Sequence, residues 1–251
     1  LEGFGARIQC GLFDDMPRSV DTLAAAQLDI VAEVVSVSEA EHALVCPSYY
    51  STDPVLERVF GAMPVDYWDE LGAGLPAETG IFWTGDRVCA ESHDARGLGE
   101  IAARLARKPV LWDNYPVNDG ARGANFLRID AFRGRGSELE GLTQAHFVNP
   151  MNQCWLSRIP LQSLALLYEQ GLDYDPDAAF ARCARAQCGE ELAAQLAADR
   201  DALQHEGLGA LSGARLAQMR ARYAAFHSPF AQELCEWLNG RYAFDPACLT
   251  D

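Results

Sequence analysis

Lysine is almost absent from this chain of 251 residues. Lys108 is the only one, and arginine supplies nearly all of the positive charge. The 20 basic residues are outnumbered by 36 acidic ones, which gives a formal net charge of −16. An excess of negative charge repels phosphate backbones and anionic lipid headgroups. We therefore expect neither nucleic acid nor a membrane among the partners of this protein.

Signals for membranes, secretion and disulfides are also missing. No apolar run approaches the about 20 residues that a spanning helix needs, and no basic-then-apolar leader opens the chain, which begins at Leu1 without an initiator methionine. The eight cysteines are scattered, with no C-x-x-C pair and no Asn-x-Ser/Thr sequon in the chain. This pattern predicts reduced thiols, no zinc site and a cytoplasmic protein.

Two catalytic signatures are absent as well, namely glycine-rich phosphate loops and the G-x-S-x-G nucleophile elbow. The five histidines lie apart and lack the spacing of metal ligands, so we interpret them as structural or surface residues. They are His42, His93, His146, His205 and His227. No metal site is expected.

The first two thirds of the chain alternates short apolar runs with amphipathic helical stretches. Strands are predicted over residues 7–13, 43–46, 80–83, 109–112 and 145–148, and helices over 20–37, 65–75, 98–106 and 156–168. Strands this short and this apolar are typical of a parallel sheet covered by helices. The sequence therefore predicts an α/β domain over residues 1–172.

Beyond about Gly171 the strand pattern stops, and alanine, leucine, arginine and glutamate dominate. Apolar residues at helical spacing predict helices over residues 190–204, 213–226 and 229–238. We expect residues 173–251 to form an α-helical bundle region, whose simplest role is packing for stability.

Polar residues follow four of the five predicted strands. Ligands of parallel α/β folds bind beyond the carboxyl ends of the strands. The segments there are Asp14-Asp15, Ser48-Tyr49-Tyr50, Asp113-Asn114 through Asn118-Asp119, and Asn149-Pro150-Met151-Asn152. Carboxylates, carboxamides and phenols of this kind, with nearby tryptophans, suit a sugar pocket.

The adjacent pair Asp14-Asp15 is the sharpest of these features. Neighbouring carboxylates at a strand end point to different sides, so they can perform different tasks on one substrate. Close like charges also raise the pKa of one partner, which keeps it protonated as an acid. The alternative is a turn or a helix cap ahead of Pro17 and Ser19. The dipeptide alone leaves both interpretations open.

In order along the chain, five segments resemble glycoside hydrolase family 84, the β-N-acetylglucosaminidases of the O-GlcNAcase type. They are GLFDDMP, CPSYYSTDPVL, IFWTGDRVC, VLWDNYPVNDGAR and VNPMNQCWLSRIPL, and the resemblance covers roughly residues 7–170. It implies a (β/α)8 barrel, of which strands 4 to 8 are present, followed by helices. It also implies a retaining glycosidase that uses no metal or cofactor, with the substrate's own acetamido oxygen as nucleophile and an oxazoline as intermediate.

The resemblance assigns a role to each matching residue. Asp14 would hold and polarise the 2-acetamido group, and Asp15 would be the general acid and base. Tyr50 would contact the acetamido group, and Trp112 would form a wall of the pocket. The remaining contacts to the sugar would come from Asn114, Asp119 and Asn149.

Family members carry the Asp pair after the fourth barrel strand, whereas here it lies at positions 14 and 15. The first three strands, with a sugar-binding glycine segment and a lysine, have no counterpart. We expect a fragment of a longer chain, which alone can be inactive; the alternative is that another chain supplies the missing strands. The open barrel edges also favour self-association.

The expected partner is a glycan or glycoprotein bearing N-acetylglucosamine, and the sequence does not say whether the aglycone is a protein, hyaluronan or a wall sugar. The alternative function is a non-catalytic glycan-binding or scaffold protein with a degenerate barrel, which the missing strands favour. The intact Asp14-Asp15 pair favours the enzyme.

Overall fold

The computed structural model describes residues 3, 5–14, 16 and 22–244. Contacts divide the chain into two compact units. The first unit comprises Leu1–Asp113 and Glu138–Phe147, and the second comprises Asn114–Ser137 and Val148–Asp251. The predicted domain border near residue 172 stays a prediction. No helix in the described ranges has the length and apolarity to cross a membrane.

Five strands in the described residues form one sheet. They are β1 (Ile8–Leu12), β2 (His42–Cys46), β3 (Gly80–Trp83), β4 (Val110–Asp113) and β5 (Ala145–Val148). The strands lie in chain order, and the pairs β1–β2, β2–β3 and β3–β4 are parallel. Each crossover contains at least one helix, so the sheet is a half-barrel and confirms the predicted partial (β/α)8 barrel.

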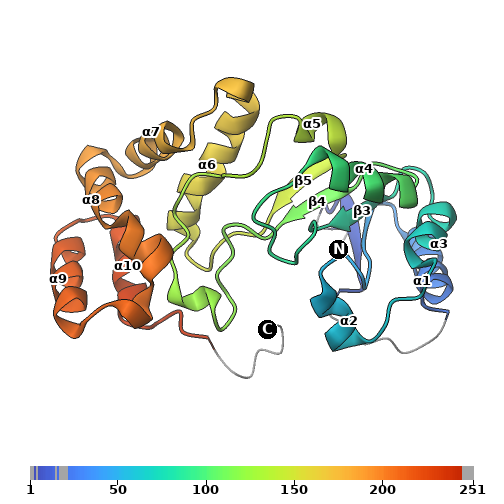
Figure 1. Ribbon diagram of the computed structural model, residues 1–251, viewed down its shortest axis with the longest axis horizontal. Coiled ribbons are helices and arrows are strands. Elements are labelled where there is room, and N and C mark those ends of the chain that lie inside the picture. The colour runs from blue at the N-terminus through green and yellow to red at the C-terminus, as the bar shows by residue number, and fades with distance from the viewer. Residues whose placement is uncertain (1–2, 4, 15, 17–21, 245–251) are drawn as a thin grey trace. The chain divides into compact units, whose positions relative to one another are not determined.

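Helices cover one face of this sheet. They are α1 (Leu23–Val37), α3 (Tyr67–Gly74), α4 (Ala95–Arg104) and the short α5 (Leu139–Leu142), while a further helix, α2 (Pro54–Phe60), follows β2 in the chain. Figure 1 shows α1, α3 and α4 beside the strands, and α3 contacts both α1 and α4. Two of the helices begin at an aspartate cap: Asp53 accepts from the amide of Val55, and Asp94 from that of Gly97.

The two faces of the sheet differ in burial because side chains alternate along a strand. Val45 and Ile81 are paired and almost fully buried, and Gly11 on the same face lies next to Val31 of α1. The opposite face, here named the inner face, carries Leu44, Gly80 and Val110 at the centre of the sheet and continues onto β1. On β1 it leaves Ile8 48% and Leu12 51% exposed.

The second unit is helical in its described part, and its long helices pack in sequence. They are α6 (Cys154–Gln170), α7 (Pro176–Cys188), α8 (Glu190–Asp201), α9 (Gly213–Ala224) and α10 (Pro229–Leu238). Short turns are η2 (Gly123–Asn125), η3 (Gly171–Asp173), the π-helical η4 (Ala202–Glu206) and η5 (Leu208–Ala210). Contacts join α6 to α7, α7 to α8, α9 to α10 and α10 back to α6, which confirms the helical region.

One apolar core holds these helices together. Its fully buried members include Leu196, Met219, Tyr223 and Trp237, and the Trp237 indole donates to the carbonyl of Ala124 at 2.9 Å. Leu127 and Ile129, which precede α6 in the chain, belong to the same cluster. The loop before β5 is therefore tied into the helical core.

Candidate active site

The predicted site residues are distributed over both units, and each set is described by itself. Asp14, Tyr50 and Trp112 lie in the first unit. Asn114, Asp119 and Asn149 lie in the second unit. Asp15, the predicted acid and base, lies outside the described residues.

Asp14 lies two residues after the end of β1 and is half-buried in a turn. By strand alternation it continues the row of Ile8, Cys10 and Leu12 on the inner face. Trp112 follows Val110 by two residues and lies on the same face of β4. The indole thus belongs to the face of the half-barrel that the helices do not cover, and Asp14 follows the strand that borders this face.

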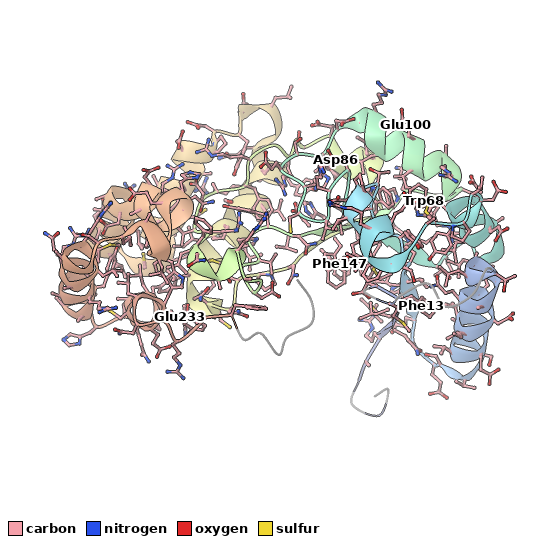
Figure 2. The ribbon with its side chains drawn as sticks, turned by 60° about the horizontal axis from the view of Figure 1, so that its bottom comes forward. Phe13, Trp68, Asp86, Glu100, Phe147 and Glu233 are labelled. Carbon is pink, nitrogen blue, oxygen red and sulfur yellow. The ribbon has the colours of Figure 1, made fainter. Side chains whose placement is uncertain are left out.

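The backbone of Phe13, the residue before Asp14, is held by hydrogen bonds through both its amide and its carbonyl. Phe13 itself is only 9% exposed (Figure 2). The amide of Phe13 donates to the carbonyl of Cys46 at 2.9 Å, which prolongs the β1–β2 pairing by one residue. Its carbonyl accepts the hydroxyl of Ser48 at 2.8 Å. Both polar groups of Phe13 are therefore fixed where the chain enters the turn.

Tyr50 lies at the end of a segment that continues the sheet beyond β2. Its carbonyl accepts the amide of Thr84 at 2.9 Å, and the amide of Thr52 donates to Gly85 at 3.2 Å. The Tyr50 side chain is 8% exposed. Its neighbour Tyr49 has a different task, because its hydroxyl donates to the carbonyl of Gly61 at 2.7 Å in the core.

Trp112 is half-buried and belongs to an aromatic cluster on the inner face. Phe82 lies edge-on to Trp112 with ring centroids 4.9 Å apart, and edge-on to Phe147 at 5.3 Å. Phe82 is 2% exposed and Phe147 39% exposed. Edge-to-face packing of this kind fixes the ring of Trp112 without covering it completely, so it can serve as an apolar wall.

A carboxylate that is not among the predicted sugar contacts ends β4 and is buried. Asp113 is 1% exposed, and its Oδ2 lies 3.1 Å from Nε2 of His146 and 3.8 Å from Nε2 of His93. The side chains of both histidines are almost completely buried. This agrees with the interpretation of these two histidines as structural residues, and it fixes the end of the strand that carries Trp112.

In the second unit two predicted carboxamides meet. Nδ2 of Asn149 donates to Oδ1 of Asn114 at 3.1 Å, and both side chains are half-buried. The bond sets the orientation of the Asn114 amide, because its oxygen faces Asn149. The structure thus brings together two residues that lie 35 positions apart in the chain.

Asn118, four residues after Asn114 in the chain, is 2% exposed. Its Nδ2 donates to Gln153 at 2.8 Å and to the carbonyl of Phe126 at 3.0 Å, and its Oδ1 accepts the amide of Asn152 at 3.0 Å. Asp119 next to it is exposed. Asn118 is therefore a structural clamp, whereas Asp119 presents its carboxylate to solvent.

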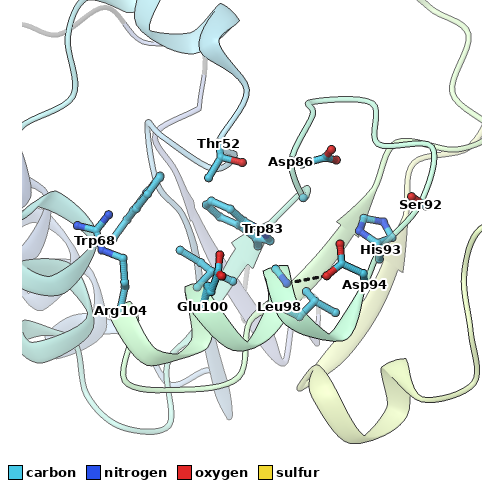
Figure 3. A pocket seen from close by; sticks show the side chains of 13 residues that line it. Thr52, Trp68, Trp83, Asp86, Ser92, His93, Asp94, Leu98, Glu100 and Arg104 are labelled. Carbon is cyan, nitrogen blue, oxygen red and sulfur yellow. Dashed lines mark hydrogen bonds between the residues drawn. The ribbon is translucent and has the colours of Figure 1, made fainter.

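The first unit also contains a cavity of about 380 Å³ that none of the predicted site residues lines. Figure 3 shows Trp83, Asp86 and His93 around it, together with Asp94, whose hydrogen bond to Gly97 caps α4. Trp68 and Trp83 meet edge-on beneath it at 5.3 Å. Among the described residues no group of three His, Cys, Asp or Glu side chains could hold a metal ion.

Comparison with known proteins identifies the family of these residues. Residues 3–199 match the family model described as beta-N-acetylglucosaminidase. The protein O-GlcNAcases of Mus musculus and Rattus norvegicus are each 26% identical over 179 residues, which is 68% of this chain and 19% of each relative. The chain thus spans about a fifth of the length of these curated relatives.

Among solved structures, a mutant of the Thermobaculum terrenum O-GlcNAc hydrolase superimposes with a TM-score of 0.74. The match has 24% identity and covers 96% of this chain and 59% of that one. At this identity the likeness supports the fold, and it includes both the half-barrel and the helices that follow it.

Proposed function

This chain belongs to the β-N-acetylglucosaminidase family, and we propose that it hydrolyses terminal N-acetyl-β-D-glucosaminides by retaining, substrate-assisted catalysis. The observation that carries the proposal is the position of Asp14, which is next to Asp15 in the sequence, just beyond the end of β1 at the carboxyl edge of a parallel half-barrel. Active-site residues of (β/α)8 enzymes come from this edge. The family match includes the pair and every other residue of the proposed site.

In the first step the acetamido oxygen of the bound sugar attacks the anomeric carbon, and the glycosidic C–O bond breaks. Asp15 gives its proton to the departing oxygen. Asp14 accepts a hydrogen bond from the acetamido N–H, which raises electron density on the attacking oxygen and stabilises the positive charge of the forming oxazoline ring. No bond forms between sugar and enzyme.

In the second step water attacks the anomeric carbon from the face that the leaving group vacated. Asp15, now a carboxylate, takes a proton from this water, and the oxazoline ring opens to restore the acetamido group. Two inversions at one carbon give net retention. One residue acts as acid and then as base, so it begins each cycle protonated.

The other proposed residues bind the sugar. Tyr50 contacts the acetamido group, and Trp112 forms the apolar wall beside it. Asn114 and Asn149 act as a pair toward the sugar, and Asp119 accepts hydrogen bonds from its hydroxyl groups. The substrate is a glycan or glycoprotein with terminal N-acetylglucosamine. The eight cysteines are scattered along the chain without the spacing of a disulfide framework, which supports a cytoplasmic setting.

The test is turnover of a 4-nitrophenyl N-acetyl-β-glucosaminide by the 251-residue chain, with a second arm that adds any residues its gene encodes upstream. We expect hydrolysis with β-anomer as first product by ¹H NMR, loss of activity in Asp15→Ala, and slower turnover of the N-trifluoroacetyl analogue, whose amide oxygen is a weaker nucleophile. Sugar binding without turnover in both arms would instead support the non-catalytic glycan-binding function.

A further inference from the structure

A closed ring of hydrogen bonds lies behind the turn that carries Asp14. It joins Gln27 of α1, Ser48 after β2 and Tyr67 of α3, which are 4%, 2% and 0% exposed. The amide of Ser48 lies 2.9 Å from the Tyr67 hydroxyl, that hydroxyl 2.6 Å from Oε1 of Gln27, and Nε2 of Gln27 2.8 Å from the Ser48 hydroxyl. The ring thus begins and ends at one residue.

The direction of every bond in this ring is fixed by chemistry. The Ser48 amide can only donate, so the Tyr67 oxygen accepts and its proton goes to Gln27. Gln27 then presents its NH2 group to the Ser48 hydroxyl. The hydroxyl proton of Ser48 has one direction left, toward the carbonyl of Phe13 at 2.8 Å, which can only accept.

That carbonyl and the amide nitrogen of Asp14 belong to the same planar peptide group. A hydrogen bond that holds the oxygen therefore holds the plane from which the Asp14 side chain departs. The amide of Phe13 is held by Cys46 on its other side. We propose that Ser48, backed by Gln27 and Tyr67, is a positioning residue that sets the orientation of Asp14 toward the acetamido group of the substrate.

This inference rests on the proposed function, because it gives the ring a task in the same reaction. Its effect follows from geometry alone, since a displacement of about 1 Å at a catalytic group costs about 10²-fold in rate. None of the three side chains touches substrate in this role. Their loss should therefore lower kcat and leave KM nearly unchanged.

The experiment compares Ser48→Thr with Ser48→Val, two side chains of equal shape of which only threonine carries the hydroxyl. With aryl N-acetyl-β-glucosaminides we expect Ser48→Thr to keep kcat within about threefold and Ser48→Val to lose about 10- to 100-fold. Thr143→Val is the matched control, because Thr143 is also buried and donates to a backbone carbonyl of the first unit, that of Leu139, at 2.7 Å.

A double-mutant cycle separates positioning from a general loss of structure. If Ser48 acts through Asp14, the variant Ser48→Val/Asp14→Ala is no slower than Asp14→Ala alone on an activated aryl substrate. Additive losses, or equal rates for Ser48→Thr and Ser48→Val, would overturn the proposal. Should Ser48→Val not fold, Tyr67→Phe breaks the same ring. We then expect Tyr67→Phe to lower kcat and to add no further loss when it is combined with Asp14→Ala. Absence of turnover in the unsubstituted chain would overturn the proposed function itself, and this proposal with it.

Discussion

Asn149 donates a hydrogen bond from Nδ2 to Oδ1 of Asn114 at 3.1 Å, which couples the two carboxamides of the proposed sugar site. A carboxylate cannot donate, so Asn149→Asp forces the Asn114 amide to turn its NH2 group inward. We expect kcat/KM to fall by at least about tenfold, which corresponds to a loss of about 1.4 kcal/mol in transition-state binding. Asn152→Asp is the control, since this exposed residue uses only its backbone amide to bind Asn118.

The two members of the Asp14-Asp15 pair should respond differently to the leaving group. Asp15→Ala removes acid catalysis, so a dinitrophenyl aglycone, which departs without a proton, should restore most of the rate. Asp14→Ala removes assistance to the nucleophile, so it should slow all substrates, whatever their aglycone. Steady-state rates on a series of aryl N-acetyl-β-glucosaminides, whose phenol leaving groups differ in pKa, check this prediction. Equal behaviour of both variants would show that the two roles are wrongly assigned.

Glu233 of α10 caps the helix α6, whose own cap residue Gln153 makes no side-chain cap bond. The Glu233 carboxylate accepts hydrogen bonds from the backbone amides of Trp155 and Leu156, both at 2.9 Å. Hydrogen bonds to a charged group contribute about 1.5–3 kcal/mol, so we expect Glu233→Ala to lower the free energy of unfolding by about this amount in urea titrations. The neighbouring exposed Gln232→Ala should change it by less than about 0.5 kcal/mol.

Substitution by alanine should change the stability of the protein in opposite directions at two of its glycines. A Cβ on Gly72 of α3 would lie 2.6 Å from the backbone of Leu105, which cannot move aside. Gly72→Ala is expected to cost about 1–3 kcal/mol as overpacking. Gly99 of α4 has no atom within 4 Å of such a Cβ, so Gly99→Ala should stabilise by about 0.5–1 kcal/mol. Thermal unfolding of both variants checks the prediction, and equal shifts would contradict the close approach of α3 to Leu105.

Burial raises the pKa of the Cys183 and Cys188 thiols to about 11. The folded chain holds these protons to higher pH than the unfolded chain does. Their contribution to stability is thus complete below about pH 8.5 and is lost as the pH rises through about 11. We expect iodoacetamide at pH 8 to modify the exposed Cys89 and Cys154 and to spare Cys183, as read by mass spectrometry. Rapid modification of Cys183 would contradict its burial.

Much of the fold was predictable because each strand is a short apolar run bounded by turn-forming residues. The helix over Pro54–Phe60 was not predicted, although Asp53-Pro54 is a start signal, because seven residues are too few to show a period. Pro176–Cys188 was not predicted as a separate helix either. Of its four buried residues, Ala179, Phe180, Cys183 and Ala184, only phenylalanine is large, so the apolar period is weak in the sequence.

The candidate site was predictable only where residues are close in sequence or match the family. Nothing in the sequence indicates that Gln27, Ser48 and Tyr67 meet, because they lie on three different elements and their bonds depend on how α1 and α3 pack. Tyr67 was predicted only as part of a helix. Likewise the burial of Asp113 between two histidines depends on tertiary packing, which a local pattern does not encode.

The ring behind Asp14 contains no group that titrates in the range where glycosidases work. Serine and glutamine do not ionise there, and burial raises the pKa of Tyr67 further above its ordinary value. The scaffold of the nucleophile-assisting carboxylate is therefore pH-invariant. The ring that positions Asp14 therefore adds no limb of its own to a pH–rate profile of this protein.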